Sequence, residues 1–270
     1  MTDTTGPELA PRLADLFDCA RMPGFGAALD RLTAALAPFD LTAVFYYPRT
    51  GLPVLLHDGF GTYGNSRALE NYVKGSYLLD AVFQACASDV ADGLYRMEDL
   101  APDAFFESDY FHAWEVHPCI SMNSGSLAEE IVFLATIGSG RIAYSLMRAN
   151  RSPRFDATEF ARLGGTAPVV MSAMRMNWDD PLRDAGPASS FGTAEQAFTT
   201  FEPGRLTDRE REIVRLMLQG HSALSSSGVL GIAEGTVKNH RKSIYSKLRI
   251  SSQAELFNSF LRHVLGPSGP

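Results

Sequence analysis

One stretch of the sequence, residues 178–205, divides the chain into two parts of opposite charge. Prolines, glycines and small polar residues interrupt any sustained apolar period there, which is typical of a linker. From Arg205 onward the chain has ten basic and five acidic side chains, a net charge of +5, and the residues before it carry −12. This asymmetry predicts two modules with different partners, over residues 1–180 and 204–266, with a linker at 181–203.

The front module has the pattern of helices packed on an antiparallel sheet. Two pairs of segments rich in strand formers flank turn residues, at Pro48–Gly51 and Gly138–Gly140, as expected for two hairpins. The strands are expected at 41–47, 52–57, 130–137 and 141–147, and helices at 26–37, 67–86, 105–116 and 158–178. Hairpins that bracket helices predict an α+β fold, in which the helices form a sandwich with an antiparallel sheet.

The composition excludes several classes of protein. Apolar residues make up 45% and charged residues 20% of the 270 residues, as in ordinary globular chains. We expect neither a signal peptide nor a transmembrane helix, because no apolar run in the sequence approaches the roughly 20 residues that span a membrane. We therefore expect no contact with a membrane. Cys19, Cys86 and Cys119 form no CxxC pair, so we expect no disulfide framework and a location in the reducing cytoplasm.

The sequence lacks the common catalytic, phosphate-binding and metal-binding motifs. We find no GxSxG elbow, no phosphate-binding GxxxxGK[ST] loop and no HExxH pair, and the Gly-rich stretch at 59–64 lies outside any βαβ unit. His112 and His117 are five residues apart, which does not place two ligands on one helical face. The sequence therefore predicts a protein that is not an enzyme, with no cofactor, no metal site and no catalytic residue.

The basic end has the pattern of helix, turn and helix. Thr207 and Glu210 form a capping box that predicts the start of a helix, and Gly220 is the residue expected just past its end. A second helix is expected over 222–230, followed by a turn at Gly231 and a third helix from Glu234. In this third helix apolar residues recur on one side and basic residues on the other, and such a helix fits the major groove of DNA.

These residues resemble the C-terminal domain of the LuxR/FixJ/NarL class of bacterial transcription regulators. The resemblance covers residues 206–264 and rests on LTDREREIVRLMLQG, LGIAEGTVKNHRKSIYSKL and SSQAELF. It implies a four-helix, all-α domain with a helix-turn-helix and a final helix, after Ser252, through which such domains pair. It also implies base contacts by Lys238, Asn239 and Lys242, with Thr236, His240 and Arg241 near phosphates.

The sequence departs from this family in the first helix of the motif. Where the family has an Asn-Lys-Glu-Ile-Ala type of stretch, residues 223–228 read ALSSSG. Three serines and one glycine lower helix propensity by about 2 to 3 kcal/mol relative to alanine, and Ser226 replaces an apolar core side chain. We therefore expect a soft helix and a domain of marginal stability on its own.

The front module is similar in its order of elements to PAS/GAF-like sensor domains, which include the acyl-homoserine-lactone domain of quorum-sensing regulators. A receiver domain does not fit, because the order of elements rich in hairpins does not supply a parallel sheet. Aromatic residues and one acid predict a pocket for a small organic effector, although the same side chains would serve an ordinary core. The candidate ligand-binding residues are Tyr47, Tyr63, Tyr72, Tyr77, Asp80, Tyr110 and Trp114.

Two alternatives stay open for this module. The lactone family has a Trp upstream of Tyr72 and an Asp-Pro pair, whereas here that Trp is missing and Asp80 is followed by Ala81. The module could also only dimerise or bind a partner protein. We expect a homodimeric regulator that binds a double-stranded DNA operator, responds to a small effector and works with RNA polymerase, because one recognition helix contacts few base pairs and two half-sites multiply affinity.

Overall fold

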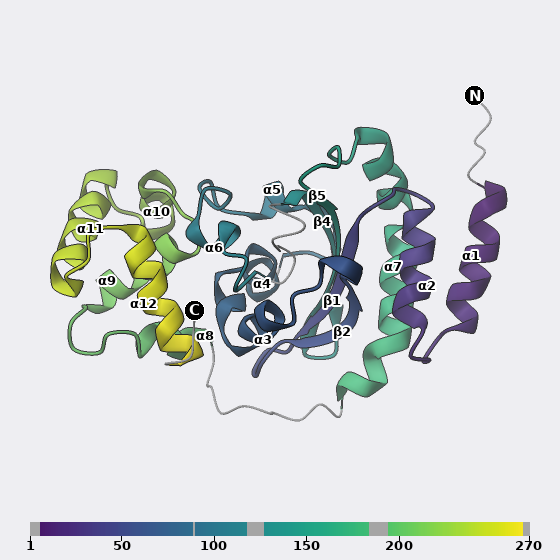
Figure 1. Ribbon diagram of the computed structural model, residues 1–270, viewed down its shortest axis with the longest axis horizontal. Coiled ribbons are helices and arrows are strands. Elements are labelled where there is room, and N and C mark those ends of the chain that lie inside the picture. Colours follow the sequence, from purple (N-terminus) through teal and green to yellow (C-terminus); the bar gives the residue numbers. More distant parts are fainter. Residues whose placement is uncertain (1–5, 89, 118–126, 184–193, 267–270) are drawn as a thin grey trace.

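The computed structural model describes residues 6–88, 90–117, 127–183 and 194–266 of the chain. An α+β part extends to residue 183, and a helical part begins at residue 194 (Figure 1). The strands are β1 (Leu41–Tyr47), β2 (Val54–Gly59), β3 (Gly93–Arg96), β4 (Leu127–Ile137) and β5 (Gly140–Ala149). Around them lie α1 (Gly6–Asp18), α2 (Phe25–Ala34), η1 (Gly61–Tyr63), α3 (Ser66–Lys74), η2 (Ser76–Leu79), α4 (Ala81–Ala87), α5 (Met97–Leu100), α6 (Asp109–His112) and α7 (Ala157–Arg183).

The five strands form one antiparallel sheet in the order β2-β1-β5-β4-β3. The two expected hairpins are present, because β1 pairs with β2 and β4 pairs with β5 through the turn at Gly138, whose φ is +55°. Strand β1 also pairs with β5 along its whole length, and this pairing joins the two hairpins. This sheet with its helices confirms the predicted α+β fold.

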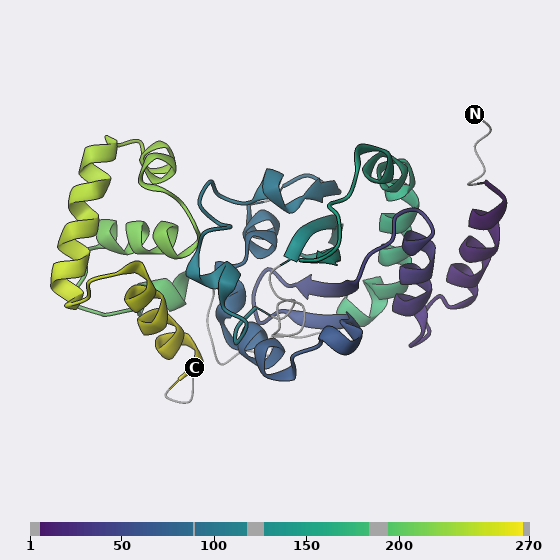
Figure 2. The same cartoon turned by 45° about the horizontal axis from the view of Figure 1, so that its top comes forward.

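Both faces of the sheet are covered by helices. Alternate residues of β1 point to opposite faces: Phe45 and Tyr47 enter the core beneath α3 and α4, and Val44 and Tyr46 enter the core beneath α2 and α7. Figure 2 shows these layers in a second view, with α1 outside α2. Because both faces are buried, β1 does not alternate between apolar and polar residues, and Thr42 is its one hydroxyl-bearing aliphatic residue.

The helices around the sheet differ from the expectation in three places. The helical zone predicted over 67–86 consists of α3, η2 and α4, because Gly75 ends α3 and Asp80 caps α4 by accepting a hydrogen bond from the Val82 amide. The helix predicted over 105–116 is reduced to α6, which Ser108 caps. The chain also has α1, η1, β3 and α5, which the patterns did not predict. Among the described residues, no helix is both long and apolar enough for a membrane span.

The helical part contains α8 (Ala194–Thr199), α9 (Asp208–Leu218), α10 (Ala223–Leu230), α11 (Glu234–Leu248) and α12 (Gln253–Leu265). Within the stretch expected to be a linker, α7 continues to Arg183 and α8 forms, and Phe191 lies outside the described residues. Phe198 and Phe201 are buried against Phe260 of α12, with ring centroids 4.7 and 5.5 Å away. The predicted division into residues 1–180, 181–203 and 204–266 stays a prediction.

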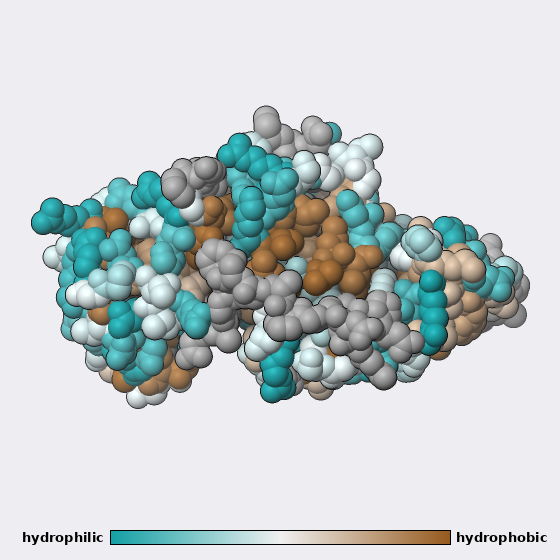
Figure 3. Space-filling view, turned by 90° about the horizontal axis from the view of Figure 1, so that it is seen from below, coloured by the Kyte–Doolittle hydropathy of each residue, from teal (hydrophilic) through white to brown (hydrophobic). Residues whose placement is uncertain are grey.

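The helical part packs directly on the helices that cover one face of the sheet. Asp103 accepts hydrogen bonds from the amide and hydroxyl of Ser222, and the Ala104 amide donates to the Gly220 carbonyl at 3.0 Å. A β-carbon at Gly220 would lie 2.6 Å from Cα of Phe105, so only glycine fits this contact. Seen from below, apolar side chains gather over the middle of the molecule, between the helical part and the helices at the other end (Figure 3).

Candidate functional site

The helix-turn-helix predicted from the sequence is built by α10 and α11 and supported by α9. Thr207 and Glu210 form the predicted capping box at the start of α9. Ser222 caps α10, and Gly231 ends it with the left-handed φ of +63° that glycine adopts at low cost. The Ser-rich stretch is therefore helical, but the Ser226 hydroxyl is buried and has no hydrogen-bond partner among the described residues.

Helix α11 packs with one face and exposes the other. Val237 and Ile244 are fully buried. Of the six residues that the resemblance assigns to DNA, Thr236, Lys238, Asn239 and Lys242 are exposed. His240 and Arg241 are half-buried, and Arg241 donates a hydrogen bond to Gln253 of α12 at 3.1 Å. The exposed row runs along the first half of the helix, where side chains of a recognition helix reach base edges.

Glu210 fixes α11 on α9. Its buried carboxylate accepts hydrogen bonds from Lys247 Nζ at 2.6 and 2.8 Å and from the Ser243 hydroxyl at 2.8 Å, both on α11. The same carboxylate accepts from the Thr207 amide at 2.8 Å. Burial alone would raise the pKa of Glu210, but the bonds from Lys247, Thr207 and Ser243 outweigh it and lower the pKa to about 2. One residue therefore sets both the start of α9 and the position of α11.

Three of the predicted ligand-binding residues form a buried hydrogen-bond chain in the α+β part. The hydroxyls of Tyr47 and Tyr72 lie 2.6 Å apart, and Tyr72 donates to Asp80 Oδ2 at 2.7 Å. Asp80 Oδ1 accepts from the Val82 amide, so both carboxylate oxygens are occupied. Burial, followed by the charge of Asp80, raises the pKa of both tyrosines well above its ordinary value. Burial raises the pKa of Asp80 too, although these hydrogen bonds oppose it.

The other predicted ligand-binding residues lie in different surroundings. Tyr77 is buried, and its ring meets Phe83 edge to face at 4.8 Å. Tyr110 is buried against Phe105, and Tyr63 is half-buried in η1. Trp114 is 41% exposed. The structure therefore brings Tyr47, Tyr72, Tyr77 and Asp80 together and leaves Trp114 at the surface.

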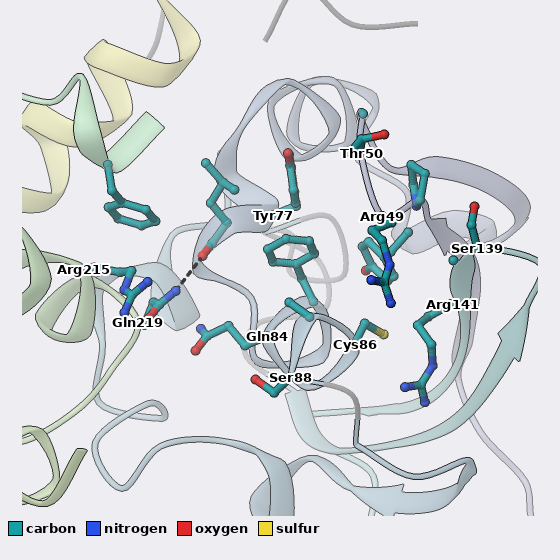
Figure 4. Close-up of a pocket in the computed structure, with 18 of the residues that line it drawn as sticks. Arg49, Thr50, Tyr77, Gln84, Cys86, Ser88, Ser139, Arg141, Arg215 and Gln219 are labelled. Carbon is teal, nitrogen blue, oxygen red and sulfur yellow. Dashed lines mark hydrogen bonds between the residues drawn. The ribbon is translucent and has the colours of Figure 1, made fainter. Parts of the chain in front are cut away.

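A cleft of about 840 Å³ opens between the α+β part and the helical part. Tyr47, Tyr77 and Phe83 lie along it, with residues of the β1–β2 turn, the β4–β5 turn and α9. Figure 4 shows Arg215 and Gln219 approaching from the helical part and Arg49 and Arg141 lying across the cleft from them. No local pattern in the sequence predicts this group of arginines, because the three residues lie far apart along the chain.

The resemblance also assigns a pairing surface to the last helix. In the structure its apolar face is buried within the same chain: Phe257, Phe260 and Leu261 are covered, and Val264 lies against Gly75 of the α+β part. Gly75 has no side chain, and a β-carbon there would lie 2.8 Å from that of Val264. Helix α12 therefore joins the two parts of the chain.

A helix-turn-helix with an exposed basic helix, joined to an α+β part, defines a class of DNA-binding transcription regulators. The family model described as "Bacterial regulatory proteins, luxR family" matches residues 204–260. An HTH-type transcriptional regulator in the exeN 3′ region of Aeromonas salmonicida is 39% identical over 145 residues, which cover 51% of this chain and 74% of that relative. The chain belongs to the luxR family of bacterial regulatory proteins, which are regulators and not enzymes.

Solved structures resemble the chain at lower identity. The LBD domain of VqsR from Pseudomonas aeruginosa is 19% identical with a TM-score of 0.51, and the match covers 62% of this chain and 94% of that one. SdiA in complex with octanoyl-rac-glycerol is 13% identical with a TM-score of 0.41, over 98% of this chain and 97% of that one. Escherichia coli SdiA is 14% identical with a TM-score of 0.40, over 86% and 88%. The VqsR match supports the α+β fold.

Proposed function

We propose that this protein is a homodimeric, cytoplasmic transcription regulator that reads duplex DNA with α11 and is controlled by a small organic effector in its front part. The observation that carries the proposal is the exposed row Thr236, Lys238, Asn239 and Lys242 on a helix whose opposite face is buried. Lysine and asparagine side chains at such positions can hydrogen-bond to purine edges in the major groove. RNA polymerase is the proposed further partner.

The proposed roles of the individual residues follow the resemblance to the LuxR/FixJ/NarL class. Lys238 and Lys242 are one helical turn apart, and Lys238 forms an ion pair with Glu234 at 2.7 Å. We assign base contacts to Lys238, Asn239 and Lys242. Thr236, His240 and Arg241 are assigned to phosphates, which position the helix without reading sequence.

The DNA-binding assignment is tested by fluorescence anisotropy with the full-length protein. The DNA would be duplexes selected by the protein from a random library, with scrambled duplexes for comparison. Lys242→Ala is expected to weaken binding to the selected duplex by about 1 to 3 kcal/mol if the residue reads a base. Lys74→Ala is the matched control, because Lys74 is exposed on α3 and the change in charge is the same.

The outcomes separate the possible roles of Lys242. A loss on the selected duplex only supports base reading, and an equal loss on both duplexes with a smaller salt dependence assigns the residue to phosphate. If Lys242→Ala binds both duplexes as tightly as Lys74→Ala does, α11 is not the DNA-reading helix and the proposal fails. Sedimentation of the full-length protein tests the dimer, with and without the duplex.

Control by a small effector is supported by the cleft and by the aromatic side chains along it. An acyl-homoserine lactone is the alternative effector, and in this structure both oxygens of Asp80 are already bonded within the protein. A front part that only dimerises or binds a protein is the other alternative. A thermal-shift screen separates these proposals, because an effector at 100 times its dissociation constant adds roughly 2.7 kcal/mol, and no shift with any compound favours the last one.

A further inference from the structure

The cleft between the two parts differs in charge from the rest of the molecule. The chain carries a net charge of −7, yet the described residues that line the cleft include Arg49, Arg141 and Arg215 and, among them, no aspartate or glutamate. No ion pair within the described residues neutralises Arg49 or Arg215, and both are exposed to solvent. Walls that carry one sign of charge concentrate the field inside a cleft and attract ions of the opposite sign.

Arg141 is the buried member of this set. It is only 7% exposed, and its Nε and one terminal nitrogen have no hydrogen-bond acceptor among the described residues. That terminal nitrogen, Nη2, forms an ion pair with Asp92 Oδ1 at 3.3 Å without the geometry of a hydrogen bond, and Asp92 also binds Arg175 and the amide and hydroxyl of Thr136. Asp92 therefore balances part of the charge of Arg141, but Nε still has no acceptor among the described residues, and a buried donor without an acceptor is costly.

The middle of the cleft suits an aromatic or apolar body. The Tyr47 and Tyr77 rings lie around Phe83, with centroids 5.6 and 4.8 Å away, and all three residues line the cleft with the half-buried Gln84. Figure 4 shows Tyr77 in the middle of the cleft, between the arginines of the sheet side and Arg215 on α9. A volume of about 840 Å³ is in the range that holds one drug-sized molecule.

We infer that the effector is a small organic anion, whose carboxylate or phosphate group binds Arg49 and Arg141 and whose aromatic body lies over Tyr77 and Phe83. The inference rests on the proposed control by a small effector and names the chemical class of that molecule. Planar guanidinium groups hold carboxylates and phosphates by paired hydrogen bonds. Because Arg215 belongs to α9, an anion in the cleft contacts both parts of the chain.

Two fluorescent probes with the same aromatic body test the requirement for charge. The anionic probe is 8-anilinonaphthalene-1-sulfonate and the neutral one is N-phenyl-1-naphthylamine, each titrated into the full-length protein. Arg141→Gln and Arg49→Gln are expected to weaken binding of the anionic probe by about tenfold or more and to leave the neutral probe unchanged. Arg151→Gln is the matched control, because Arg151 is exposed beyond the opposite end of β5 from Arg141.

Competition then separates the two kinds of anionic group. Benzoate and phenyl phosphate are expected to displace the anionic probe. The better competitor of the two identifies the anionic group of the effector as a carboxylate or a phosphate. Benzamide and inorganic phosphate are expected to compete at least tenfold less well. Arg49→Gln keeps the test valid if Arg141→Gln does not fold, because Arg49 is exposed in a turn.

The inference is overturned if Arg49→Gln and Arg151→Gln bind the anionic probe equally, or if benzamide competes as well as benzoate. Its failure is distinct from failure of the proposed function. If the full-length protein binds its selected duplex but shows no preference for anions, only the inference about the effector is rejected. If the protein prefers anions through Arg49 but binds no duplex, the proposed role in transcription is rejected.

Discussion

The buried carboxylate of Glu210 gives the most direct test of how α9 holds the recognition helix. The substitution is Glu210→Gln, which removes the charge but keeps an oxygen that can complete the capping box with Thr207. In the folded protein the pKa of Glu210 is about 2, against an ordinary value of 4.5, and each pKa unit corresponds to 1.36 kcal/mol. This difference predicts a loss of about 3 kcal/mol of stability in the helical part.

The loss of about 3 kcal/mol is an upper value, because Lys247, the partner of Glu210, is partly exposed. The Lys247 side chain is 39% exposed, so water can solvate its ammonium group after the substitution. The cost should therefore fall at or below the lower end of the range for breaking a fully buried pair, about 3 to 5 kcal/mol. Glu212→Gln is the control on the same helix: its carboxylate is 47% exposed and pairs with Arg209 at the surface, so the change should cost about 0.5 kcal/mol or less.

The pH dependence has a definite sign. Because the folded state lowers the pKa of Glu210, its contribution to stability is complete above about pH 4.5 and is lost as the pH falls towards 2. Urea denaturation combined with hydrogen exchange of α9 and α11 measures the helical part separately from the sheet. Equal stability of Glu210→Gln and Glu212→Gln, or a wild-type acid dependence that persists in Glu210→Gln, would refute this reasoning.

Three further substitutions test other contacts. Ser226→Ala removes a buried hydroxyl without a partner and should stabilise the helical part by about 1 kcal/mol, measured by urea denaturation. Gly220→Ala should push the α9–α10 turn away from Phe105, seen as faster hydrogen exchange around residue 105; unchanged exchange would argue against the contact. Burial and the charge of Asp80 raise the pKa of Glu130 to about 8, so its contribution to stability is lost as the pH rises from about 4.5 to 8, and melts of Glu130→Gln should show a weaker dependence over that interval.

Local signals made the helical part predictable from the sequence. The capping residues Thr207 and Ser252 and the glycine at 231 each satisfy groups within a few residues, so the pattern alone carries the information. The hairpins of the sheet were equally clear for the same reason. Their turns lie at Pro48–Gly51 and Gly138.

The missed features depend on contacts between distant residues. Asp80 ends one helix and caps the next inside a stretch that is otherwise apolar, and the apolar period concealed that break. Helix α1 contains Pro11, which lowers the expectation of a helix there. The exposure of Trp114 and the arginine-lined cleft result from tertiary packing, since Arg49, Arg141 and Arg215 come from one turn of the sheet, strand β5 and helix α9.

The position of α12 has a consequence for how two chains could associate. While Val264 rests on Gly75, the apolar side of this helix is occupied within its own chain and cannot at the same time cover the same helix of a second chain. Pairing through α12 and closure of the two parts upon each other are therefore mutually exclusive states. In a dimer that paired through α12, the contact of Val264 with Gly75 would have to open, and this opening would change the distance between the two copies of α11 and with it the spacing of the half-sites.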